Sequence, residues 1–141
     1  MPIVGFNFEK ILAERKKPID GPVKVSADVN IKNIEEEKFK VGKSEELLKF
    51  NFEVKIDYEK VGQVELTGHV LYIDEPKKMK EVIEEWNKKK NIKQEIAREI
   101  INMILFKTNV KALSLEQDIN LPLHLRLPKV APVKDAKEYI G

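Results

Sequence analysis

Two histidines are the side chains of this sequence best suited to move protons near neutral pH. His69 lies in a segment where apolar and polar residues alternate, and His124 lies between two prolines. Neither has a partner at a fixed spacing along the chain that would orient it as a general acid or base. We therefore expect both histidines to have structural or surface roles.

Acidic and glycine-containing segments offer no better catalytic candidate. Adjacent acids such as Glu84 and Glu85 do not face each other on a helix, and the acidic run at 35–37 is typical of a hydrated loop. The segment 42–44 lacks the upstream glycine that a phosphate-binding loop requires. The chain has no cysteine, which excludes disulfides, thiolate metal sites and cysteine nucleophiles. We expect no enzyme activity, no bound metal ion and no cofactor.

A run of lysines at 88–90, followed by Lys93, is the best candidate for contact with phosphates. Glutamates surround it, and the chain carries 26 Lys+Arg against 24 Asp+Glu, a formal net charge of +2. We therefore do not expect nucleic acid to be the main partner.

The 141 residues correspond to one domain, which we place at 1–141, with a loose tail from about residue 129. Hydrophobic residues make up 42% of the chain, enough for one core, and charged residues make up 35%, typical of a heat-adapted surface. No apolar run approaches the roughly 18 residues of a membrane span, and Glu9 and Lys10 interrupt the stretch where a signal peptide would be apolar. We expect a cytoplasmic protein without a membrane partner.

Alternating apolar residues predict strands at 23–31, 48–58 and 64–72. A turn at 60–62 indicates that the last two form an antiparallel hairpin. Gly68 takes an inward position in the last strand, which marks a bulge or lets another element approach closely.

Two further segments allow more than one interpretation. We favour a strand at 6–13 that changes parity at a bulge near Glu9 and Lys10, although the same residues fit one side of a short helix. The segment 33–47 is charged and poorly periodic, so we interpret it as a long solvated connection.

Pro76, which follows two acids, predicts the start of a helix. Its apolar stripe consists of Met79, Val82, Ile83 and Trp86. Residues 88–91 end this helix, and Asn91 with Gln94 resembles a capping box for a second one that extends to about Ala112. The second helix has a wide stripe, with Met103 and Phe106 broadening it, so we expect contacts from more than one direction.

In residues 119–127, one isoleucine and four leucines take every second position, and Pro122, His124 and two further residues, both polar, take the positions between them. The prolines Pro122 and Pro128 exclude a helix or a central strand, so this segment is predicted to be an extended strap on an apolar surface. The fold class is therefore α+β: a four-stranded antiparallel sheet, two C-terminal helices on one face, and a proline-containing strap.

The apolar residues exceed what this architecture easily covers. Leu71 and Ile73 make the outward side of the last strand apolar near its end. The strap could close a monomeric core as a lid, or the surplus surface could be shared between subunits or offered to a partner. We favour the second explanation.

The order of these elements resembles the SecB family of export chaperones and its SecB-like relatives, over residues 6–125. Similar motifs are Phe6-Asn7-Phe8-Glu9-Lys10-Ile11 in the first strand, Ala97-Arg98-Glu99-Ile100-Ile101 in the second helix and Asn120-Leu121-Pro122 in the strap, while 68–73 falls where the family's fourth strand ends. The resemblance implies a homotetramer, built as a dimer of dimers, that holds unfolded chains in apolar grooves without ATP.

The sequence departs from the family at two places. Its outward charges are mixed in sign where bacterial members are acidic, and residues 107–109 stand where the family has an aromatic-proline step. A general holdase, or one with another dedicated client, fits better than an export factor.

On this basis we expect unfolded protein clients to bury alternate apolar side chains in a groove between the first strands and the strap. The groove residues are Ile11, Leu12, Val23, Val25, Leu113, Leu115, Ile119, Leu121 and Leu123. The residues expected at a dimer or tetramer interface are Leu71, Ile73, Met79, Val82, Ile83 and Trp86. The stripe of the first helix could instead pack on its own sheet. A homo-oligomeric scaffold or small apolar-ligand-binding protein is the alternative, and a nucleic-acid-associated protein a lesser one.

Overall fold

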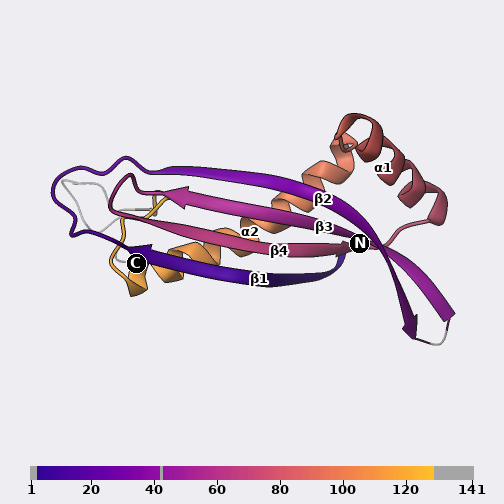
Figure 1. Cartoon of the computed structure of the whole chain (residues 1–141), viewed down its shortest axis with the longest axis horizontal. Coiled ribbons are helices and arrows are strands. Elements are labelled where there is room, and N and C mark those ends of the chain that lie inside the picture. Colours follow the sequence, from indigo (N-terminus) through magenta and orange to yellow (C-terminus); the bar gives the residue numbers. More distant parts are fainter. Residues whose placement is uncertain (1–2, 42, 129–141) are drawn as a thin grey trace, which may run out of the picture.

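The computed structural model describes residues 3–41 and 43–128, where four strands are followed by two helices (Figure 1). The strands are β1 (Ile3–Arg15), β2 (Ser26–Val41), β3 (Lys43–Asp57) and β4 (Gly62–Tyr72), and the helices are α1 (Pro76–Lys89) and α2 (Gln94–Asp118). The strands pair antiparallel in the order β1-β4-β3-β2. In Figure 1, α2 crosses behind the sheet on a diagonal. The predicted α+β fold class is confirmed.

The inner face of the sheet, the face toward the helices, holds the core. Its buried side chains on β3 and β4 are Leu48, Phe50, Phe52, Val54, Ile56, Val64, Leu66, Val70 and Tyr72. Gly68 takes an inward position among them, and a Cβ there would lie 2.9 Å from the Phe52 ring. Opposite Gly68, the register of β1 shifts between Phe8 and Lys10. The strand at 6–13, its bulge and the close approach at Gly68 are therefore confirmed.

The interpretation of 33–47 as a solvated connection is wrong, because β2 and β3 form a long hairpin that pairs out to Val41 and Lys43. The register of β2 shifts between Ile31 and Asn33, and this bulge moves the apolar residues to the other parity. Ile34 is consequently buried, although it breaks the alternation that Val29 and Ile31 begin. Figure 1 shows the hairpin projecting past the rest of the sheet.

The helices begin and end partly as predicted. α1 starts at Pro76 and ends before Lys90, which has a left-handed φ of 51°. The capping box is wrong: the residue before α2 is Lys93, without a side-chain cap, and the amide of Asn91 donates to Glu85 at 2.9 Å instead. α2 continues past Ala112 to Asp118, so Leu113 and Leu115 are helical.

Within the described residues, neither helix combines the length and apolar character that a membrane span needs. The tail expected from about residue 129 lies outside the described residues.

Candidate binding surface

The strap (residues 119–127) starts from a tight helix end. Asn120 has a left-handed φ of 57°, a conformation that asparagine tolerates better than most residues. The backbone N–H of Leu121 donates to the carbonyl of Glu116 at 2.9 Å, which satisfies one of the last helical carbonyls. The chain thereby reverses over the end of α2 and brings Leu121, only 5% exposed, into the core.

His124 fixes the strap to α2 through a buried polar network. Its Nδ1 lies 2.9 Å from Glu116 Oε1, and its Nε2 lies 2.9 Å from Asn109 Oδ1. Its backbone N–H donates to Glu116 Oε2 at 3.2 Å, and the hydroxyl of Tyr58 donates to the same oxygen.

The network is closed to solvent, which decides what chemistry it can do. The side chains of His124 and Glu116 are 4% and 0% exposed. Burial, together with the hydrogen bond and the charge of Glu116, raises the pKa of Tyr58 far above its ordinary value. No substrate can reach a group held in this way, so the arrangement is a structural anchor and agrees with the structural role expected for His124.

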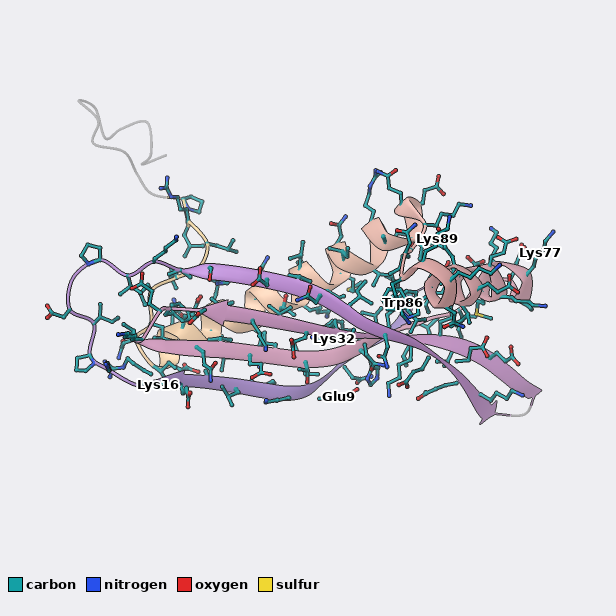
Figure 2. The ribbon with its side chains drawn as sticks, turned by 45° about the horizontal axis from the view of Figure 1, so that its top comes forward. Glu9, Lys16, Lys32, Lys77, Trp86 and Lys89 are labelled. Carbon is teal, nitrogen blue, oxygen red and sulfur yellow. The ribbon has the colours of Figure 1, made fainter. Side chains whose placement is uncertain are left out.

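The outer face of the sheet, opposite the helices, is polar. His69 lies there with its Nδ1 2.5 Å from Glu9 and its Nε2 3.2 Å from the amide of Asn7. Charged residues of both signs pair across the strands, as in Lys10–Glu65 and Lys32–Glu53, both at 3.2 Å. Figure 2 labels Glu9 and Lys32 on this sheet. The expected mixed sign of this surface is confirmed, and its charges are largely neutralised by their neighbours.

The side of α2 away from the core carries apolar side chains in water. Its buried side repeats every fourth residue, at Ile100, Ile104, Thr108, Ala112 and Glu116. Phe106 and Val110 lie on the opposite side, 66% and 60% exposed. We call Met103, Phe106 and Val110 the outer stripe of α2.

A shallow groove of about 320 Å³ runs between this stripe and the start of β1, lined by Ile3, Glu99, Asn102, Met103 and Phe106. Ile11 lies farther along β1, opposite Leu66, and is therefore on the same inner face of the sheet. It is an exposed residue of an edge strand. Among the described strands, β1 is at the edge of the sheet, so the inner side of this edge combines apolar side chains with a strand edge that no other described strand pairs with.

The nine expected groove residues separate into four groups. Ile11 and Leu123 are exposed, Leu12 and Leu113 are partly buried, and Val23, Val25, Leu115 and Ile119 are partly buried against the core. Leu121 belongs to the core itself, so the expectation that it lines an open groove requires correction. The strap covers this part of the surface because the His124 anchor folds it back on α2.

The expected interface residues on α1 face their own sheet. Met79, Val82 and Trp86 are buried in the core, Ile83 packs against it, and α1 contacts β2 and β3. Figure 2 shows Trp86 between α1 and the strands, with Lys77 and Lys89 projecting away. The stripe therefore packs mainly on its own sheet, the alternative given above, and Ile83 is its one partly buried member.

Leu71 and Ile73 are only partly buried. The side chain of Leu71 lies on the outer face against Gly5 of β1. Part of the apolar surface expected at this end of β4 is thus covered within the chain.

Sequence reasoning missed the outer stripe of α2 as a separate feature. Phe106 and Met103 were interpreted as a broadening of one core stripe, and Val110 was not singled out. The spacing of 103, 106 and 110 is itself helical, and the buried stripe at 100, 104 and 108 runs on the other side. Two apolar stripes on one helix are the signal that could have separated them.

A second cavity, of about 500 Å³, lies between α1 and α2 and is mostly acidic. Its charged lining residues are Asp74, Lys78, Glu81, Glu85, Lys93, Glu95 and Glu99. The hydrogen bond from the Tyr72 hydroxyl, at 2.8 Å, holds the pKa of Asp74 below its usual range. Among the described residues no group of acids and histidines has the arrangement of a metal site.

Comparisons with known proteins give one structural likeness. No family model matches the chain, and no curated protein matches it in sequence. Among solved structures, the chain is similar to the Mycobacterium tuberculosis SecB-like chaperone Rv1957, in a complex with a peptide from the HigA1 antitoxin. The TM-score is 0.44 at 11% identity, over 93% of this chain and 91% of the chaperone.

Proposed function

We propose that this protein binds extended apolar polypeptide segments without ATP, as a holdase-type chaperone. The observation that carries the proposal is that large apolar side chains of α2 and β1, namely Phe106, Val110 and Ile11, stay exposed to water. The leucines of the strap, Leu123, Leu125 and Leu127, add to this exposed surface. Apolar side chains gathered along an edge in this way are typical of an interaction surface.

The physical basis is burial of apolar area and requires no chemical step. Each client side chain that packs against this surface contributes roughly 1.5–3 kcal/mol. Several such contacts along one extended segment combine through effective concentration into useful affinity with little sequence specificity. This mechanism needs no catalytic group, metal ion or cofactor.

Further copies of the chain are the second partner in this proposal, in a dimer or tetramer. The outer stripe of α2 supports it, because an isolated copy leaves two large apolar side chains in water. Leu71 and Ile73 add a smaller apolar area at the end of β4.

The decisive experiment measures suppression of the aggregation of a chemically unfolded test protein. We expect the wild-type chain to suppress aggregation at stoichiometric amounts, and the double variant Phe106→Asp, Val110→Asp to lose most of this activity. The control is Lys107→Asp, Ser114→Asp, which changes two exposed polar positions of the same helix and should keep the activity. A wild-type chain that suppresses no aggregation contradicts the proposal.

Light scattering and salt dependence separate the remaining classes. Apolar client binding should hold or strengthen as salt is raised, whereas binding to phosphates weakens steeply. A mass above that of one chain that falls to one chain in the Phe106→Asp, Val110→Asp variant would place the outer stripe in a subunit contact.

A small apolar-ligand-binding protein is the second candidate, favoured by the groove of about 320 Å³ beside Ile3, Met103 and Phe106. This volume is at the lower end of the range of ligand pockets. Calorimetric titration with a medium-chain fatty acid tests it. Saturable binding that Met103→Asp abolishes, without suppression of aggregation by the wild type, would favour this candidate over the chaperone.

A further inference from the structure

Leu121 and its backbone hydrogen bond to Glu116 hold the start of the strap, and beyond Leu121 the polar contacts of the strap come from one residue, His124. Within the described residues, every hydrogen bond that joins residues 122–128 to the rest of the chain involves His124. Leu123, Leu125 and Leu127 on either side of it are exposed. The position of the strap beyond Leu121 is therefore decided by the contacts of His124 with Glu116 and Asn109.

The strap bends at residues 124 and 125, and this bend lets Leu121 and His124 both turn toward the protein. Leu121 enters the core, Leu123 points to water, His124 is held in the buried network, and Leu125 points to water again. Partly buried apolar residues pack against the core near this end, and four of them belong to the expected client groove: Val23, Val25, Leu115 and Ile119.

Glu116 determines which peptide segments could take the place of the strap. The side chain of Glu116 is fully buried, and the ring of His124 is its hydrogen-bond partner from the strap. Removing the strap would leave the carboxylate without that partner, which is costly in a buried site. An occupant that replaces the strap must therefore supply an apolar side chain and, three residues later, a side chain that donates a hydrogen bond to Glu116.

We propose that the strap is an internal occupant of a client site, latched by the His124–Glu116 pair, and that it must be released before an external segment can bind there. The external partner is a peptide segment that bends as the strap does, with a large aliphatic residue followed at the third position by a hydrogen-bond donor such as histidine, lysine or arginine. This inference rests on the proposed function, because it concerns where and when a client segment binds.

The test uses the full chain and a fluorescent synthetic peptide with the sequence of residues 118–127. The variant His124→Ala releases the latch, and we expect it to bind the peptide at least about tenfold more tightly than the wild type, since a hydrogen bond to a charged group that held the strap is lost. A peptide in which aspartate replaces the leucine of position 121 should not bind. The matched control His69→Ala removes the other histidine, on the outer face, and should bind like the wild type.

Hydrogen exchange provides the second measurement. In His124→Ala, the backbone amides of Leu121 and of residue 124, which donate to Glu116 in the wild type, should exchange at least about tenfold faster, while those of β3 and β4 remain unchanged. Should His124→Ala fail to fold, His124→Gln keeps a hydrogen-bond donor without the charge and tests the same point.

The outcomes distinguish the latch from the proposed function. Equal peptide binding by the wild type and His124→Ala, or unchanged exchange in the strap, overturns the latch even when the wild type suppresses aggregation. A wild type that suppresses no aggregation contradicts the proposed function. Tight binding of the peptide by His124→Ala in that case would still support the internal occupant.

Discussion

Two histidine–glutamate pairs, one on the outer face of the sheet and one where the strap meets the end of α2, lie in opposite surroundings. On the outer face, His69 lies 2.5 Å from Glu9, with side chains that are 16% and 50% exposed. At the end of α2, His124 lies 2.9 Å from Glu116, with side chains that are 4% and 0% exposed. Water and salt reach the first pair and screen it, whereas the second pair must satisfy its charges within the protein.

The difference in surroundings matches a difference in partners. Glu9 also lies 3.9 Å from Lys49, so its charge has an alternative partner when His69 is removed. Glu116 receives donors from Tyr58 and from the side chain and backbone of His124, which come from two distant parts of the chain. Pairs of the same chemistry therefore differ in what they do: the outer one neutralises a surface, and the inner one joins the strap, α2 and the β3–β4 turn.

The largest expected effect is that of Glu116→Ala. It leaves His124 and the hydroxyl of Tyr58 buried without their partner, so the free energy of unfolding should fall by about 3–5 kcal/mol. Urea denaturation followed by circular dichroism measures it. Glu9→Ala on the outer face should cost about 0–1 kcal/mol. Equal losses in the two variants would contradict the contrast between the faces.

Tyr58→Phe tests the buried network of Tyr58, Glu116 and His124 through a second residue. It removes one hydrogen bond to a buried charge and should cost about 1.5–3 kcal/mol. Because the folded state raises the pKa of Tyr58, its stabilising contribution is complete below the unfolded value of about 10 and is lost as the pH rises further.

Denaturation at alkaline pH tests whether stability falls in this direction. The stability of the wild type should fall above about pH 10, and Tyr58→Phe should flatten that fall. Tyr72→Phe is the comparison variant, since Tyr72 donates to Asp74 at a less enclosed place and its pKa is also raised by burial and by that carboxylate. A wild type whose stability stays constant above pH 10 would contradict the assignment for both tyrosines.

The glycines of the two faces give the third contrast. A Cβ at Gly68, on the inner face, would lie 2.1 Å from the backbone oxygen of Asn7, which cannot move without disturbing β1. Gly68→Ala should therefore cost about 1–3 kcal/mol by overpacking. A Cβ at Gly5, on the outer face, would meet the flexible end of Leu71 at 3.1 Å. Gly5→Ala should be nearly neutral in thermal denaturation, and a larger loss than at Gly68 would refute this account.

Local patterns in the sequence were enough to predict the inner face. The alternation from Leu48 to Tyr58 and the inward Gly68 depend on the pleat of a single strand. The hairpin at 33–47 was missed because the bulge after Ile31 shifts the parity, and a charged strand edge has the composition of a loop.

The candidate site was harder to predict because its partners are distant in the sequence. The contact of Tyr58 with Glu116 joins residues 58 positions apart, and no spacing rule connects them. Leu121 has the same alternation as the exposed Leu123, and only the reversal of the chain at Asn120 places it in the core. Patterns within one element identify its faces, whereas the closure of the strap depends on contacts between elements.

The smallest expected effect concerns the ion pair of Lys32 and Glu53 on the outer face, where the atoms lie 3.2 Å apart. A double-mutant cycle of Lys32→Ala and Glu53→Ala should give a coupling of about 0.2–1 kcal/mol, which decreases in 1 M salt.

Partial desolvation raises the pKa of Glu53, but the hydrogen bond and charge of Lys32, with help from Lys55, outweigh it and leave the pKa lowered. The contribution of Glu53 is therefore present above the unfolded value of about 4.3 and is lost as the pH falls through the folded one. A coupling above that of the buried network, or one that salt leaves unchanged, would mean that the outer face is shielded from water by another molecule. Such a result would move the proposed subunit contact from the outer stripe of α2 to the open face of the sheet.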